Sequence, residues 1–139
     1  MKFPIILIDI PKIKELQLGI IISKSKISFT ESRFNFNLEL IGLKFCDSEG
    51  KIFTLKSIKK LSKNYNPLNF LLLLERQTFG EYNFVDIHKK ISLVEFKVIS
   101  NKITRIENSE KEANEIIQFI DKSDSDTEII GLFTLGKQG

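Results

Sequence analysis

The chain has 139 residues, 42% of them hydrophobic and 28% charged, and its formal net charge is +3. This length fits one domain spanning residues 1–139, and the composition excludes a chain that is disordered throughout. With one histidine and one cysteine, the chain can form neither an intramolecular disulfide nor a tetrahedral zinc site of the usual ligands.

Strand patterns dominate the first third of the chain. Apolar runs at residues 4–8 and 18–22 predict two short strands. Residues 33–40 alternate Phe and Leu with Asn and Glu, and this period of two predicts a strand with one buried face. Residues 47–50 (Asp-Ser-Glu-Gly) are typical of a turn, so residues 33–55 are predicted to form a hairpin.

A lysine-rich segment follows. Residues 55–63 are predicted to form a short helix, on which Lys56, Lys59, Lys60 and Lys63 share one face. Such a face could bind phosphate groups of a nucleic acid or of a phosphorylated ligand. The alternative interpretation is a solvated outer face, because no glycine-rich phosphate-binding loop accompanies these lysines.

Residues 68–79 allow two interpretations. Asn66 and Pro67 could cap and begin a helix, whereas the apolar run at residues 70–74 favours a central strand. We expect a strand, because residues 83–87 resemble its returning partner.

The last third of the chain contains the clearest helix signal. Residues 94–106 are predicted to form a second hairpin that turns at residues 100–102. A helix is predicted over residues 110–122, because Ser109 begins a capping box and the apolar residues repeat at helical spacing. Residues 129–134 are predicted to form a final strand.

These elements predict the α+β class, with a mostly antiparallel sheet of seven to nine strands, one main helix and one short helix. A partly open β-barrel with a helix is the alternative architecture. Residues 26–31 resemble residues 90–95, and this similarity raises the hypothesis of two repeated ββαβ units.

One pair of residues could support catalysis. An extended strand over residues 82–88 places Asp86 and His88 on one face, where the carboxylate could orient the imidazole as a general base. The alternative is that His88 is a polar residue at the end of a strand. Asp86 and His88 are therefore minority candidates for an enzyme site.

Acidic residues are dense after the predicted main helix. They are Asp121, Asp124, Asp126 and Glu128. An EF-hand pattern fails because Ile129 stands where glycine is needed and Leu135 where a glutamate is needed. We expect a solvated connection between helix and strand, with no metal and no cofactor.

The chain is richer in surfaces for binding than in residues for chemistry. Residues 1–80 carry 13 Lys and Arg against 7 Asp and Glu, whereas residues 81–139 carry 8 against 11. Cys46 is expected to be a small buried residue on a strand. The longest apolar run is far shorter than a membrane span of about 20 residues, and we expect a cytoplasmic protein.

We therefore expect a small non-enzymatic intracellular binding protein that acts through a protein–protein interface, as an inhibitor, an immunity-type protein or an assembly subunit. An unpaired edge strand would serve as its docking site or as the seam of a homo-oligomer. The alternatives are binding of nucleic acid or a phosphorylated ligand through the lysine face, and an enzyme with a pocket around Asp86 and His88.

Overall fold

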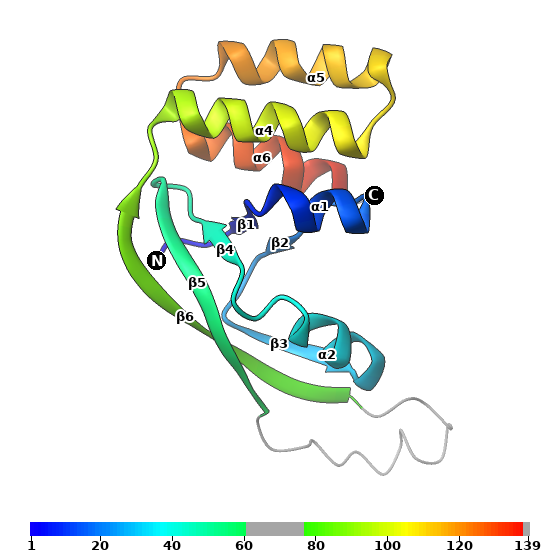
Figure 1. Cartoon of the computed structure of the whole chain (residues 1–139), viewed down its shortest axis with the longest axis vertical. Coiled ribbons are helices and arrows are strands. Elements are labelled where there is room, and N and C mark those ends of the chain that lie inside the picture. Colours follow the sequence, from blue (N-terminus) through cyan, green and yellow to red (C-terminus); the bar gives the residue numbers. More distant parts are fainter. Residues whose placement is uncertain (61–76, 138–139) are drawn as a thin grey trace. The chain divides into compact units, whose positions relative to one another are not determined.

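The computed structural model describes residues 1–60 and 77–137 (Figure 1). The strands are β1 (Ile5–Leu7), β2 (Ile21–Ile22), β3 (Lys26–Thr30), β4 (Lys44–Cys46), β5 (Lys51–Lys60) and β6 (Gln77–Lys90). The helices are α1 (Ile10–Leu16), α2 (Glu31–Leu38), α4 (Leu93–Glu107), α5 (Glu110–Lys122) and α6 (Asp126–Lys137). The predicted α+β class is confirmed, but the described residues hold six strands and five helices, so both predicted counts are wrong.

The six strands form one antiparallel sheet in the order β2-β1-β4-β5-β6-β3. β1 pairs with β2 on one side and with β4 on the other, so that Ile6 faces Ile21 and Cys46. β3 pairs with β6 at the far end of the order. Among the described strands, β2 and β3 lie at the two ends of this order.

The contacts within the chain divide it into two compact units. Unit 1 comprises Met1–Ser23, Lys44–Phe53 and Asp86–Gly139, and unit 2 comprises Lys24–Leu43 and Thr54–Val85. The long strands β5 and β6 contribute residues to both units. The single domain expected from the length stays a prediction.

The core of unit 1 combines strand and helix side chains. In its helical part, α4 contacts α1, α5 and α6. The largest fully buried side chains of the unit are Ile5, Leu7, Ile13, Phe45, Phe96, Ile120, Ile129 and Ile130. Each fully buried side chain of this size contributes roughly 1.5–3 kcal/mol relative to an exposed one, so this cluster dominates the stability of the unit.

The core of unit 2 is built around the ring of Phe29 on β3. This ring makes edge-to-face contacts with Phe34 and Tyr82, at centroid separations of 6.0 and 5.8 Å. A side-chain carbon at Gly80, on the neighbouring strand, would overlap the Phe29 ring. Glycine at position 80 therefore allows β3 and β6 to pair closely around this ring.

Residues 33–38 lie in helix α2, so the predicted strand over residues 33–40 is wrong. Thr30 caps the helix, because its hydroxyl oxygen accepts a hydrogen bond from the Arg33 N–H at 3.3 Å. Successive residues on a helix are about 100° apart, so Phe36 and Leu38 flank the buried Asn37 on opposite sides. The strand-like alternation therefore leaves these two side chains 37% and 39% exposed.

The predicted hairpin over residues 94–106 is also wrong, because these residues lie in helix α4. Ser92 caps this helix by accepting a hydrogen bond from the Glu95 N–H at 3.2 Å. Residues 100–102, predicted as a turn, lie inside the helix, where the Thr104 hydroxyl donates to the Ser100 carbonyl at 2.8 Å. The buried residues of α4 repeat at helical spacing, and this packing decides its structure.

Of the remaining predicted elements, one is confirmed and two are wrong. The helix over residues 110–122 is confirmed as α5, with Ser109 as its cap. Residues 129–134 lie in α6 instead of a strand, and residues 55–60 lie in β5 instead of a helix.

The two repeated ββαβ units are wrong as well, because three helices follow β6 without a further strand in residues 91–137. The predicted strand at residues 70–74 lies outside the described residues. None of the helices in the described ranges has both the length and the apolar composition needed to cross a membrane.

Candidate ligand-binding cleft

An open cleft of about 410 Å³ lies on unit 1. The residues that line it are Ile8, Lys44, Ile52, Ile87, Lys89, Lys90, Ile91 and Glu95. Four isoleucines thus share one depression with three lysines and one glutamate. Its volume falls within the range of small-molecule sites, which is about 300–1,000 Å³.

The fold brings these residues together from five segments of the chain. Ile8 follows β1, and its N–H donates to the carbonyl of Lys44, the first residue of β4, at 3.0 Å. The Ile91 N–H, just after β6, donates to the Gly50 carbonyl at 2.9 Å and fixes this segment to the β4–β5 turn. The cleft is therefore framed by backbone hydrogen bonds.

A break in β6 shapes one wall of the cleft. His88 has a φ of 56°, in the left-handed region. A regular strand sends successive side chains to opposite faces, yet both Lys89 and Lys90 line the cleft. The turn of the backbone at His88 explains how consecutive lysines reach the same depression.

The charges at the cleft are unbalanced. Lys44, Lys89 and Lys90 are exposed, and none of them forms an ion pair within residues 1–60 and 77–137. Glu95 is the one acidic residue of the lining, and its own N–H is bound to the Ser92 cap. The cleft thus offers apolar side chains and an excess of positive charge.

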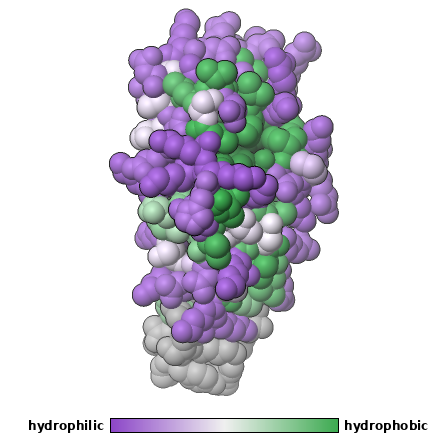
Figure 2. Space-filling model, turned by 60° about the vertical axis from the view of Figure 1, so that its left-hand side comes forward, coloured by the Kyte–Doolittle hydropathy of each residue, from purple (hydrophilic) through white to green (hydrophobic). Residues whose placement is uncertain are grey.

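Figure 2 shows apolar residues exposed between hydrophilic ones on the side of the molecule that carries β6.

Three of the four lysines predicted to share a helical face lie on a strand instead. Lys56, Lys59 and Lys60 lie on β5, where Lys56 and Lys60 have the same parity and Lys59 the opposite one. The Lys60 ammonium lies 4.9 Å from the centre of the Phe34 ring, in a cation–π contact within unit 2. Lys63 lies outside the described residues. The role of these lysines in binding nucleic acid or a phosphorylated ligand stays a prediction.

Asp86 and His88 contact each other through the backbone. The Asp86 carboxylate accepts a hydrogen bond from the His88 N–H at 2.8 Å, an arrangement that supports the left-handed turn. The His88 side chain is exposed and does not line the cleft. The predicted general-base role of this pair stays a prediction.

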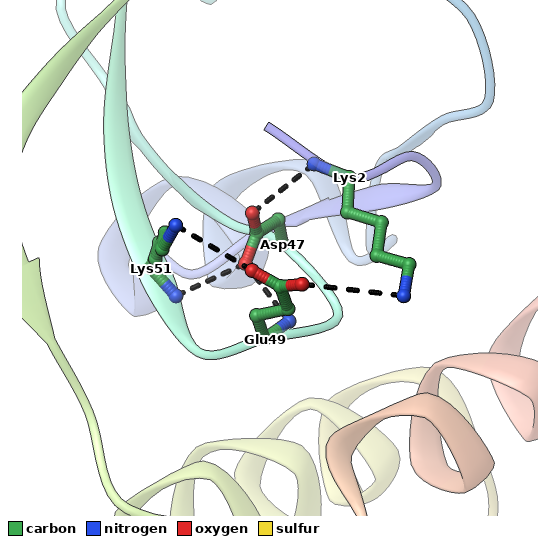
Figure 3. A network of polar contacts seen from close by, with 4 residues as sticks. All are labelled: Lys2, Asp47, Glu49 and Lys51. Carbon is green, nitrogen blue, oxygen red and sulfur yellow. Dashed lines mark hydrogen bonds and ion pairs between the residues drawn. The ribbon is translucent and has the colours of Figure 1, made fainter.

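A buried carboxylate organises the turn between β4 and β5 (Figure 3). Asp47 is fully buried and accepts three backbone hydrogen bonds, from Glu49 at 2.9 Å, Lys51 at 3.0 Å and Lys2 at 3.2 Å. Glu49 forms ion pairs with Lys51 at 3.5 Å and Lys2 at 4.0 Å. This network uses the carboxylate to hold backbone, which is a structural role.

Cys46 is buried on β4, as predicted. Burial raises the pKa of its thiol to about 12, with further contributions from the charges of Asp126 and Asp47. Such a thiol is not a nucleophile at neutral pH. Its packing, and not its reactivity, matters for the fold.

The acidic stretch connects two helices, so the predicted helix-to-strand connection is wrong. Ser125 and Glu128 both accept hydrogen bonds at the start of α6. The Ser125 hydroxyl accepts from the Glu128 N–H at 3.3 Å, and the Glu128 carboxylate accepts from the Asp124 N–H at 3.2 Å. Among the described residues, no group of three or more His, Cys, Asp or Glu side chains could hold a metal ion.

Sequence reasoning missed the cleft. The adjacent lysines Lys89 and Lys90 are visible as a charged pair at the end of a predicted strand, but nothing local links them to Lys44. Only the strand order places β4 and the end of β6 on either side of β5. Comparison with family models, with curated protein sequences and with solved structures found no match.

Proposed function

We propose that this chain is a binding protein for a small amphipathic anion, which occupies the cleft on unit 1. A single observation carries the proposal: four isoleucines and three lysines line the same depression. An apolar chain or ring would cover the isoleucines, and a carboxylate or phosphate group would meet the ammonium groups. This site supports ligand binding more directly than the protein–protein interface that the sequence favoured.

The physical chemistry sets the expected affinity. Removing apolar surface from water contributes about 25 cal/mol per Å², while each exposed charge pair contributes about 0.2–1 kcal/mol. At roughly 0.3–0.4 kcal/mol per non-hydrogen atom, a ligand the size of octanoate binds with a Kd on the order of 1 mM. Neither a purely apolar nor a purely charged molecule uses both parts of the cleft.

The test is a titration of the isotope-labelled chain with octanoate, followed by backbone amide chemical shifts. We expect the largest shifts at Lys44, Ile87 and Ile91, and much smaller ones with acetate or with cationic octylamine. Equal binding of octylamine, shifts confined to other parts of the chain, or no binding at all would overturn the proposal.

Matched variants test the role of the charges. Lys44→Gln and Lys89→Gln each remove an exposed ammonium group from the cleft and should weaken octanoate binding about 2–5-fold. Lys111→Gln removes the same charge from an exposed position on α5 that does not line the cleft, and should leave the affinity unchanged. If all three variants bind alike, the lysines of the cleft do not hold the anion.

A second candidate function is contact between copies of this chain through α4. Val94 and Val98 are four residues apart on the helix and are 71% and 49% exposed. Sedimentation velocity over a wide concentration range should then show reversible dimers that the Val94→Ser and Val98→Ser double variant loses. Val85→Ser, which changes an exposed valine of β6, is the control. A wild-type chain that remains monomeric at high concentration would refute this candidate.

A further inference from the structure

Three segments of unit 1 converge at Gly50, in the turn between β4 and β5. A methyl group added at Gly50 would lie 2.8 Å from the Ile91 carbonyl oxygen, 3.0 Å from Asp126 Oδ2 and 3.6 Å from Lys90 Cγ. The end of β6 and the first residue of α6 therefore meet at the same point. The φ of Gly50, +82°, also requires glycine there.

This convergence places a carboxylate beside a lysine of the cleft. Asp126 Oδ2 and the Lys90 side chain are both within 4 Å of one position, and Lys90 is part of the cleft lining whereas Asp126 is not. Burial raises the pKa of Asp126, the Lys90 charge lowers it and the Asp47 charge raises it. Asp126 and Lys90 therefore interact electrostatically next to Gly50.

We propose that Asp126 sets the affinity of the cleft by competing with the bound anion for Lys90. This inference rests on the proposed function. A ligand that brings a carboxylate to Lys90 also brings it toward Asp126, and two negative charges then share one ammonium group. Asp126 is a positioning residue: it acts on the ligand through Lys90 and does not line the cleft.

The charged groups around Asp126 support this assignment. Lys90 comes from β6 and Asp47 from the β4–β5 turn, and the Asp126 charge also reaches Cys46 on β4. Of these, Asp47 is committed to three backbone N–H groups and Cys46 is a neutral thiol. Lys90 is therefore the cationic neighbour of Asp126 whose charge a ligand can share.

The experiment is the octanoate titration on charge-removing variants of the full chain. Asp126→Asn should bind octanoate about 2–5-fold more tightly than wild type, which is the most that one exposed ammonium group contributes, and Asp126→Ser, which suits the start of a helix, should do the same. Asp124→Asn removes an exposed carboxylate two residues earlier and should have no effect. Thermal unfolding of each variant verifies that α6 still forms.

A double-mutant cycle separates this mechanism from a general charge effect. Lys90→Gln should weaken binding, and Asp126→Asn in the Lys90→Gln background should give no gain, because the competition requires the ammonium group. Two results would overturn this inference alone. The first is a gain in octanoate affinity that persists without Lys90. The second is no gain for both Asp126 variants while wild type binds octanoate in the cleft. Absence of octanoate binding by wild type would instead overturn the proposed function, and this inference with it.

Discussion

Replacing Asp47 is expected to destabilise unit 1 by about 3 kcal/mol. The carboxylate is fully buried and accepts hydrogen bonds from three backbone N–H groups, and a bond to a charged group contributes about 1.5–3 kcal/mol. Glu49 and Lys2 are both exposed, so their N–H groups regain water in Asp47→Ala. Lys51, at the start of β5, is exposed as well, so the three losses do not add in full, and the expected cost corresponds to about one hydrogen bond to a charged group.

The isosteric variant gives the reasoning a sharper test. Asp47→Asn keeps an oxygen acceptor at Oδ1, which holds the Glu49 and Lys51 N–H groups, but it loses the charge and the acceptor at Oδ2. We expect a loss of about 1–1.5 kcal/mol, measured by urea unfolding at neutral pH. Asp124→Asn, at an exposed carboxylate, should stay within about 0.5 kcal/mol of wild type. Equal losses for Asn and Ala at position 47, or a loss below about 1 kcal/mol for Ala, would show that the carboxylate does not hold the turn.

Three further predictions concern packing and ionisation. Gly80→Ala forces a methyl group onto the Phe29 ring and should cost roughly 2 kcal/mol, and Phe29→Leu in the same chain should recover part of the added loss in denaturant unfolding. Cys46, with a pKa near 12, should not react with a disulfide reagent at pH 8 in the native protein, yet should react fully in denaturant; rapid native labelling would contradict its burial. Burial raises the pKa of Asp126 above its ordinary value of 3.8, so the folded protein holds the Asp126 proton more tightly than the unfolded chain does. The free energy of unfolding therefore falls as the pH rises from 3.8 through the raised pKa of the folded state. Asp126→Asn should therefore gain stability relative to wild type between pH 4 and pH 7, and a constant difference across that range would contradict the assignment.

Helices could be predicted from the sequence where local signals agree. For α5, the Ser109 cap and the helical spacing of its apolar residues point to the same structure, and its bounds were predicted correctly. For α2, the alternation of Phe and Leu with Asn points to a strand, but the Thr30 cap and the packing of Asn37 on the inner side win. Thr30, the residue before α2, is a helix-cap signal that opposes the period of two.

In α4 the two periodicities compete within one segment. Val94, Phe96 and Val98 alternate, but Phe96, Ser100 and Ile103 repeat at helical spacing, and these three are buried together with Thr104. The alternating valines are consequently left on the surface. Ser100 obscures the helical period because a serine at this position is typical of a turn, although its side chain is fully buried.

The cleft could not be predicted because its residues are joined only by strand order and by a turn. Lys44 and Lys90 line the same cleft because β4, β5 and β6 lie side by side in the sheet. The left-handed residue His88 then directs both Lys89 and Lys90 into it. No spacing in the sequence encodes either event.

The β4–β5 turn links the stability of unit 1 to the charge of the cleft. Asp47 holds the turn, and Gly50 in the same turn is the point against which Lys90 and Asp126 both lie. The Asp47 charge also raises the pKa of Asp126, so Asp47→Asn lowers that pKa toward its ordinary value as well as loosening the turn. A lower pKa leaves Asp126 more fully ionised over the pH range in which it titrates, so it competes more strongly for Lys90. Removing the Asp47 charge should therefore lower the affinity of the cleft for an anion even where the lining of the cleft is unchanged.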